Sequence, residues 1–140
     1  MGDVLYAATQ FGTRTVREES RGRSTVLLVD PDPAALAAMD QALRDRGFVT
    51  ATAFDGSGAL AASQRVGTLN LLVTNVQAAP MHAVELADVL RRQHPGLQVL
   101  YMMTSEDELF EDRLLSGDDD VIEKPFSGGE LVEAVSSLLR

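Results

Sequence analysis

The chain of 140 residues has room for one compact domain, and its 45% of hydrophobic residues can supply that domain with a core. No apolar run approaches the roughly 20 residues of a membrane-spanning helix, and the lack of cysteine excludes disulfides and thiolate metal sites. The net charge of −9 argues against non-specific nucleic-acid binding, which requires a basic surface.

The first 24 residues show neither helical nor strand periodicity and end in the polar, arginine-rich sequence REESRGRS. We interpret residues 1–24 as a flexible tail or linker and residues 25–140 as the folded domain. The tail lacks the basic start and apolar centre of a secretory signal, so the cytoplasm is the expected compartment. Its arginines could touch an acidic partner, but a solvated leader is the favoured interpretation.

From residue 25 onward, a short apolar run, a turn and a helical stretch alternate five times. Most of the apolar runs are continuous rather than alternating, which is typical of strands buried on both faces of a parallel sheet. The predicted strands are residues 26–29, 49–54, 69–73, 99–103 and 121–122.

The segments between these strands carry helix start and stop signals. Asp32 can cap the first helix, with Pro33 in its first turn, and Gly47 can end it. A hydroxyl residue followed three positions later by glutamate opens the fourth helix and again the fifth, as in a capping box. The other four helices are expected near residues 57–65, 82–93, 105–117 and 127–138.

Five strands alternating with five helices predict an α/β fold whose parallel strands are joined by right-handed crossovers. For a domain of about 115 residues, we expect a doubly wound five-stranded parallel sheet with helices on both faces. The expected strand order is 2-1-3-4-5, the flavodoxin-like order, which places a site beyond the carboxyl ends of the strands. The residues at those ends are 30–32, 75–77, 103–105 and Lys124.

Four segments at these strand ends resemble the signature segments of response-regulator receiver domains. They are VLLVDPDP, NLLVTNVQAAPM, QVLYMMTS and GDDDVIEKPF. The resemblance covers residues 25–140, and four segments in the right order are more specific than any one alone. It implies a cytoplasmic two-component signalling protein in which a histidine kinase phosphorylates an aspartate in the presence of Mg²⁺.

Matched residue by residue, the chain departs from the receiver pattern where the chemistry takes place. The resemblance places the phosphoacceptor at Asn75, whose amide is a poor nucleophile and brings no charge to a metal. Of the paired acids, Asp30 is in place, but the second position falls on Pro31, which has no ligand group. Asp32 is better explained as a helix cap, so Asp30 and Asp32 are only weak candidates for metal ligands.

The positions that would respond to a phosphate also differ. The resemblance places the switch hydroxyl at Met103, and a shift of one residue in the match would place it at Thr104. Val121 stands where an aromatic residue often couples to that switch. Lys124, the chain's one lysine, is retained, and the resemblance implies a cis bond before Pro125.

The charges of the site therefore change. A working receiver gathers three carboxylates, which repel one another and attract a divalent cation. Here Asp30 remains opposite Lys124, with Asn75 as a neutral neighbour, so we expect Lys124 to bond to Asn75 or to Asp30. The expected result is a closed, vestigial pocket without metal or cofactor. Its residues are Asp30, Pro31, Asn75, Met103, Thr104 and Lys124.

The sequence thus favours a pseudo-receiver that is not an enzyme but a phosphorylation-independent protein–protein interaction module. The expected partners are a histidine kinase, an output domain, another regulator or a second copy of the chain, and neither nucleic acid nor a membrane. Candidates for the partner-binding face are Phe110, Glu111, Val121 and Glu123, although Phe110 could equally pack in the core.

Two alternatives remain open. The chain could accept phosphate weakly, through Asp32 or through Asn75 after its deamidation. It could instead be a flavodoxin-like binder of a small ligand, but no nucleophile–base pair is visible and no glycine-rich phosphate loop follows the first strand.

Overall fold

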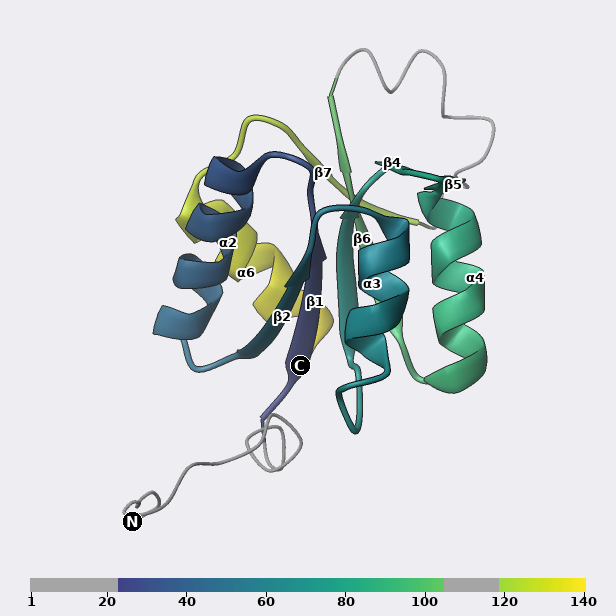
Figure 1. The fold of residues 1–140 in the computed structure, drawn as a ribbon. Coiled ribbons are helices and arrows are strands. Elements are labelled where there is room, and N and C mark those ends of the chain that lie inside the picture. The colour runs from purple at the N-terminus through teal and green to yellow at the C-terminus, as the bar shows by residue number, and fades with distance from the viewer. Residues whose placement is uncertain (1–22, 105–118) are drawn as a thin grey trace.

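The computed structural model describes residues 23–104 and 119–140. Within these ranges the chain forms a five-stranded parallel sheet covered by helices on both faces (Figure 1). The strand order, β2-β1-β3-β6-β7, is the predicted 2-1-3-4-5 order. The strands are β1 (Thr25–Val29), β2 (Val49–Ala53), β3 (Leu71–Asn75), β6 (Gln98–Met103) and β7 (Asp120–Glu123).

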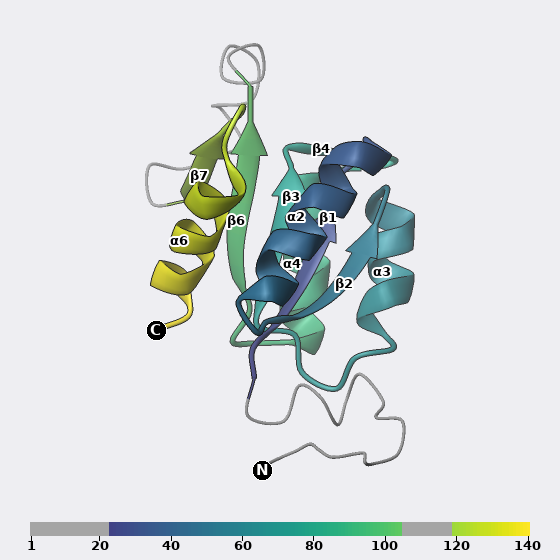
Figure 2. The ribbon, with the colours of Figure 1, turned by 90° about the vertical axis from the view of Figure 1, so that its left-hand side faces the viewer.

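The helices divide into two layers. Helices α2 (Pro33–Asp45) and α6 (Gly128–Leu138) cover one face, and α3 (Gly56–Ser63) and α4 (Ala83–Gln93) cover the other (Figures 1 and 2). Along β1, Val26 and Leu28 pack in the core beneath α2 and α6, whereas Leu27 and Val29 pack in the core beneath α3 and α4. Because both faces of the strand are buried, its sequence is a continuous apolar run.

The helix ends follow the predicted local signals. Asp32 accepts a hydrogen bond from the backbone N–H of Ala34 at 3.0 Å, and Pro33 opens α2. Gly47 follows the helix with φ of 90°, a left-handed conformation that favours glycine. Ser127 caps α6 within the predicted capping box.

The third strand lies two residues later than predicted. Leu69, expected to begin it, is buried in the preceding loop, where its backbone N–H donates to His94 Nδ1 at 3.3 Å. The strand instead runs to Asn75, which is in register with Met102 of β6. Asn75, the position matched to the phosphoacceptor, is therefore the last residue of the strand rather than part of the following loop.

A small two-stranded sheet after β3 was not predicted. It joins β4 (Gln77–Ala78) to β5 (Met81–His82) and packs against the start of α3. The backbone N–H of Gly56 donates to Ala79 O at 2.8 Å, and a Cβ at Gly56 would lie 2.5 Å from Ala78 O. Glycine is therefore required at this contact.

Three expectations fall partly or wholly outside the described residues: the tail of residues 1–24, the fourth helix with its capping box, and the partner candidates Phe110 and Glu111. Within residues 23–104 and 119–140, no helix is long and apolar enough to cross a bilayer.

Candidate functional site

An ion pair joins the ends of the first and last strands of the sheet. Asp30 follows β1, Lys124 follows β7, and Lys124 Nζ donates to Asp30 Oδ2 at 2.7 Å. The Asp30 side chain is 1% exposed and that of Lys124 is 26% exposed. The expected bond of Lys124 to Asn75 or Asp30 is thus confirmed for Asp30. The expected cis bond between Lys124 and Pro125 is also present.

The second carboxylate oxygen of Asp30 is used as well. Asp30 Oδ1 accepts from the backbone N–H of Asp32 at 2.9 Å. The carboxylate of Asp32 in turn caps α2, as its position in the sequence indicates. Pro31, at the second acidic position of the pattern, is exposed and offers no ligand atom. A buried carboxylate with a donor on each oxygen is stable without a metal.

Asn75 lies beside Asp30 because β1 and β3 pair in parallel, with Val29 in register with Thr74. Its Oδ1 atom is buried and accepts no hydrogen bond from the residues that the structure describes. A buried acceptor left in this state costs about 1–3 kcal/mol. Asn75 is therefore adjacent to the ion pair without sharing in its hydrogen bonds.

The Mg²⁺ that the resemblance implies does not fit this donor set. Hard cations need several oxygen ligands, but Asp30 is engaged by Lys124 and Asp32 serves as a helix cap. Asn75 supplies no charge. Across the described part of the chain, no group of three or more acidic, histidine or cysteine side chains could hold a metal ion.

The two candidates for the switch position, Met103 and Thr104, lie at the end of β6. Met103 ends β6 in a buried position, and its carbonyl accepts from the backbone N–H of Lys124 at 2.8 Å. Thr104 follows and is half-buried. These positions do not decide between Met103 and Thr104 as the switch residue, so the choice of Met103 stays a prediction.

An aromatic residue that sequence reasoning overlooked lies next to Val121. Tyr101 of β6 is in register with Val121 of β7 and is buried in the core under α3 and α4. Burial, followed by the negative charge of Asp119, raises the pKa of Tyr101 to about 12. The sequence QVLYMM contains this tyrosine, but its apolar pattern predicted only a buried strand and not the position of the ring next to Val121. The aromatic ring is thus on the neighbouring strand, while Val121 is 43% exposed.

A pocket of about 270 Å³ opens beside the ion pair, between α2 and the start of α6. Its polar end consists of Asp30, Asp32 and Lys124, and its other walls are mainly apolar. The lining residues are Asp30, Asp32, Ala35, Ala38, Met39, Lys124, Phe126 and Gly128. Of the six residues of the predicted pocket, Asp30 and Lys124 line this cavity, whereas Pro31, Asn75, Met103 and Thr104 do not.

Two of the four candidates for the partner-binding face can be placed. Val121 and Glu123 are exposed on β7, the edge strand of the sheet. Phe110 and Glu111 lie outside the described residues. The structure therefore places half of the predicted surface.

Comparison with known proteins agrees with this architecture. Residues 26–136 match the family model described as the response regulator receiver domain. The probable transcriptional regulatory protein TcrX of Mycobacterium tuberculosis is 40% identical over 119 residues, which cover 83% of this chain and 50% of that protein. The DNA-binding response regulator MtrA of Mycolicibacterium smegmatis is 33% identical over 121 residues, covering 84% of this chain and 51% of that protein.

Solved structures share the fold. A response regulator receiver protein from Sinorhizobium medicae superposes with a TM-score of 0.72 at 25% identity, covering 86% of this chain and 97% of that one. The chemotaxis response regulator CheY4 of Vibrio cholerae gives a TM-score of 0.69 at 23% identity, with 83% and 98% covered. The chain spans about half the length of the curated relatives named above. By the family match over residues 26–136, the chain belongs to the response-regulator receiver family.

Proposed function

We propose that this receiver domain acts as a phosphorylation-independent protein–protein interaction module in cytoplasmic signal transduction. The observation that carries the proposal is the Asp30–Lys124 pair beside a neutral Asn75. In the receiver pattern, this lysine neutralises a phosphate on the residue at position 75. Here its ammonium bonds to a buried carboxylate, and the acceptor position has no carboxylate to phosphorylate.

The charge balance supports the same proposal. Mg²⁺ would have to compete with an ammonium 2.7 Å from Asp30 Oδ2, without the two further acids that a receiver supplies. Asp32 is a poor substitute acceptor, because its carboxylate is bonded to the backbone at the start of α2. The domain would therefore remain in one state, and partners would recognise a fixed surface.

Acetyl phosphate with Mg²⁺, followed by intact-mass measurement, tests the lack of phosphorylation. The unaltered chain should show no gain in mass. A matched variant, Pro31→Asp with Asn75→Asp, restores the acids of the pattern and should show both Mg²⁺ binding and phosphoryl transfer. A phosphoryl group on the unaltered chain, located to Asp32 or to a deamidated Asn75, would favour the weakly phosphorylatable receiver instead.

We place the partner surface on β7, with Val121 as its apolar centre and Glu123 on its acidic rim, and we expect Glu111 to belong to that rim as well. The side chains of Val121 and Glu123 are exposed. A kinase, an output domain or another regulator with a basic, partly apolar surface would fit. The named functions of TcrX and MtrA suggest a partner in transcriptional control, and the DNA contacts would then belong to that partner.

Affinity capture from the native cell tests this surface. Val121→Asp combined with Glu111→Lys should abolish capture of the specific partner, while Ala37→Asp, an exposed change on α2, should not. Phosphorylation conditions should leave capture by the unaltered chain unchanged. Undiminished capture by the double variant would move the interface to another face.

A further inference from the structure

The strand β2 lies at one edge of the sheet, and half of its backbone faces outward. The N–H of Val49 donates to Ser24 O at 3.1 Å, and the carbonyl of Ala53 accepts from Asp30 N–H at 3.2 Å, both toward β1. Because backbone groups alternate in direction along a strand, Thr50 and Thr52 direct theirs away from β1. Among the described residues no other strand pairs with that side. The β2 edge, Thr50–Phe54, therefore offers unpaired backbone donors and acceptors.

The two edges of the sheet differ in how they are protected. The opposite edge, β7, carries Asp120 and Glu123, and pairing two copies of β7 would bring like charges together. The β2 sequence, VTATA, contains no charge and no proline. Thr52 is exposed, so neither flanking helix covers the middle of the strand, and Phe54 is 57% exposed. The β2 strand thus lacks the charged residues and the proline that often prevent edge pairing.

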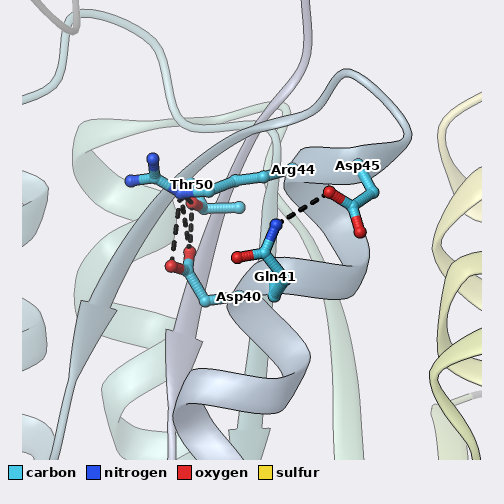
Figure 3. A network of polar contacts seen from close by, with 5 residues as sticks. All are labelled: Asp40, Gln41, Arg44, Asp45 and Thr50. Atoms are coloured by element: carbon cyan, nitrogen blue, oxygen red, sulfur yellow. Dashed lines mark hydrogen bonds and ion pairs between the residues drawn. The ribbon is translucent and has the colours of Figure 1, made fainter.

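A fixed cation lies at the amino-terminal end of this edge (Figure 3). Arg44 Nε lies 3.0 Å from Thr50 Oγ1 and 3.2 Å from the Asp40 carboxylate, and the Thr50 hydroxyl also bonds to Asp40. The two terminal amino groups of Arg44 take part in none of the contacts drawn, and the side chain is 61% exposed. The network therefore holds a guanidinium beside Thr50 with donors directed to solvent.

The carboxyl-terminal end of the edge carries an acid, whereas at the amino-terminal end Arg44 is already paired with Asp40. Asp55 follows Phe54, is exposed, and caps α3 by accepting from the backbone N–H of Gly58 at 2.7 Å. One short edge thus carries a cation at its start and an aromatic ring with an acid at its end. A two-fold axis that pairs this edge antiparallel with itself places each cation opposite the acid and ring of the other copy.

We propose that the β2 edge binds a second copy of this chain, forming a two-fold dimer with a continuous sheet centred on Thr52. In this register Thr52 faces Thr52 of the other copy, and Thr50 faces Phe54. Arg44 would then pair with Asp55 and stack on Phe54 across the interface, twice by symmetry. A strand from another protein could use the same backbone groups, but self-pairing also accounts for an exposed guanidinium at one end and an acid with an aromatic ring at the other. The dimer does not depend on the proposed lack of phosphorylation.

Cross-linking tests the register directly, because the chain has no cysteine of its own. In an antiparallel hydrogen-bonded pair the two Cα atoms lie about 5.5 Å apart, within the roughly 4.4–6.8 Å that disulfides span. Thr52→Cys should therefore form an interchain disulfide under mild oxidation. Thr68→Cys, another exposed threonine in the loop before β3, is the matched control and should cross-link at least about tenfold more slowly. Equal rates for the two variants would overturn the proposal.

Charge exchange at the same position gives a second test, read out by analytical ultracentrifugation of the full chain. Thr52→Lys and Thr52→Asp each place like charges opposite each other and should weaken self-association about tenfold or more. A one-to-one mixture of these two variants should restore the dimer as a heterodimer. Thr68→Lys should leave association unchanged. A chain that is monomeric throughout the dilution series, or a dimer indifferent to both Thr52 variants, would contradict the β2 interface.

Discussion

The ends of β1 and β3 lie side by side, yet their buried polar side chains differ in charge and in hydrogen bonding. Asp30 is charged, and each of its carboxylate oxygens receives a hydrogen bond. Asn75 is neutral, and its buried oxygen accepts none from the described residues. A buried charge without partners costs far more than a buried amide without one. This difference in cost explains why Lys124 bonds to Asp30 rather than to Asn75, although Asp30 and Asn75 lie at the same edge of the sheet.

The largest effect should come from removing the cation of the pair. Lys124→Met leaves Asp30 buried without its ammonium and should lower the free energy of unfolding by about 2–3 kcal/mol, somewhat less than for a fully buried pair because Lys124 is partly exposed. Urea denaturation at neutral pH measures the loss. The double variant Asp30→Asn, Lys124→Met should recover most of it. A loss below about 0.5 kcal/mol for Lys124→Met would mean that Asp30 does not need its partner.

Placing a second charge at the end of β3 should remove the contrast between the two strand ends. Asn75→Asp puts a carboxylate beside Asp30, and repulsion between the two should destabilise the domain by about 1–2 kcal/mol without metal. The pair of acids should also begin to attract Mg²⁺. Thermal unfolding with and without Mg²⁺ checks both expectations, with the unaltered chain, insensitive to the metal, as control. If Mg²⁺ changed the unfolding temperature of the unaltered chain as much as that of Asn75→Asp, our description of the site would be contradicted.

The helix cap next to the pair should have a smaller effect. Asp32→Ala removes the acceptor for Ala34 N–H and should cost about 1 kcal/mol, whereas Asp32→Asn, which can still cap, should cost only a few tenths. Chemical denaturation compares the two variants. If Asp32→Asn were as damaging as Asp32→Ala, the negative charge of Asp32 would matter beyond capping.

The smallest effect should come from removing the unsatisfied amide. Asn75→Leu eliminates the buried Oδ1 while roughly keeping the volume of the side chain, so stability should stay within about 0.5 kcal/mol of the unaltered chain or rise. The same urea titration applies, with Asn75→Ala as a control for lost packing. A loss above about 1 kcal/mol for Asn75→Leu would show that the amide makes a hydrogen bond that stabilises the fold.

Much of the fold could be predicted because its signals are local. Continuous apolar runs indicated strands buried on both faces, and a cap followed by proline indicated where α2 begins. Two features depended on contacts between distant segments. The strand β3 begins two residues later than predicted, and Leu69, in the loop before β3, donates its backbone N–H to His94 instead. Tyr101 lies beside Val121 because β6 pairs with β7. The cap of α4 is local by contrast, since His82 Nδ1 accepts from the backbone N–H of Val84 two residues later.

The sequence by itself determined which groups would meet at the carboxyl edge of the sheet: one aspartate, one lysine and one asparagine. Parallel strands guarantee that meeting, because their carboxyl ends share an edge. Tertiary structure decided which of them bond. Lys124 reaches Asp30 because a buried anion gains more from an ammonium than a neutral amide does. Among the residues that the structure describes, tertiary structure also left the outer side of β2 without a paired strand, since the placing of helices against an edge strand depends on packing between layers and not on the strand's own residues.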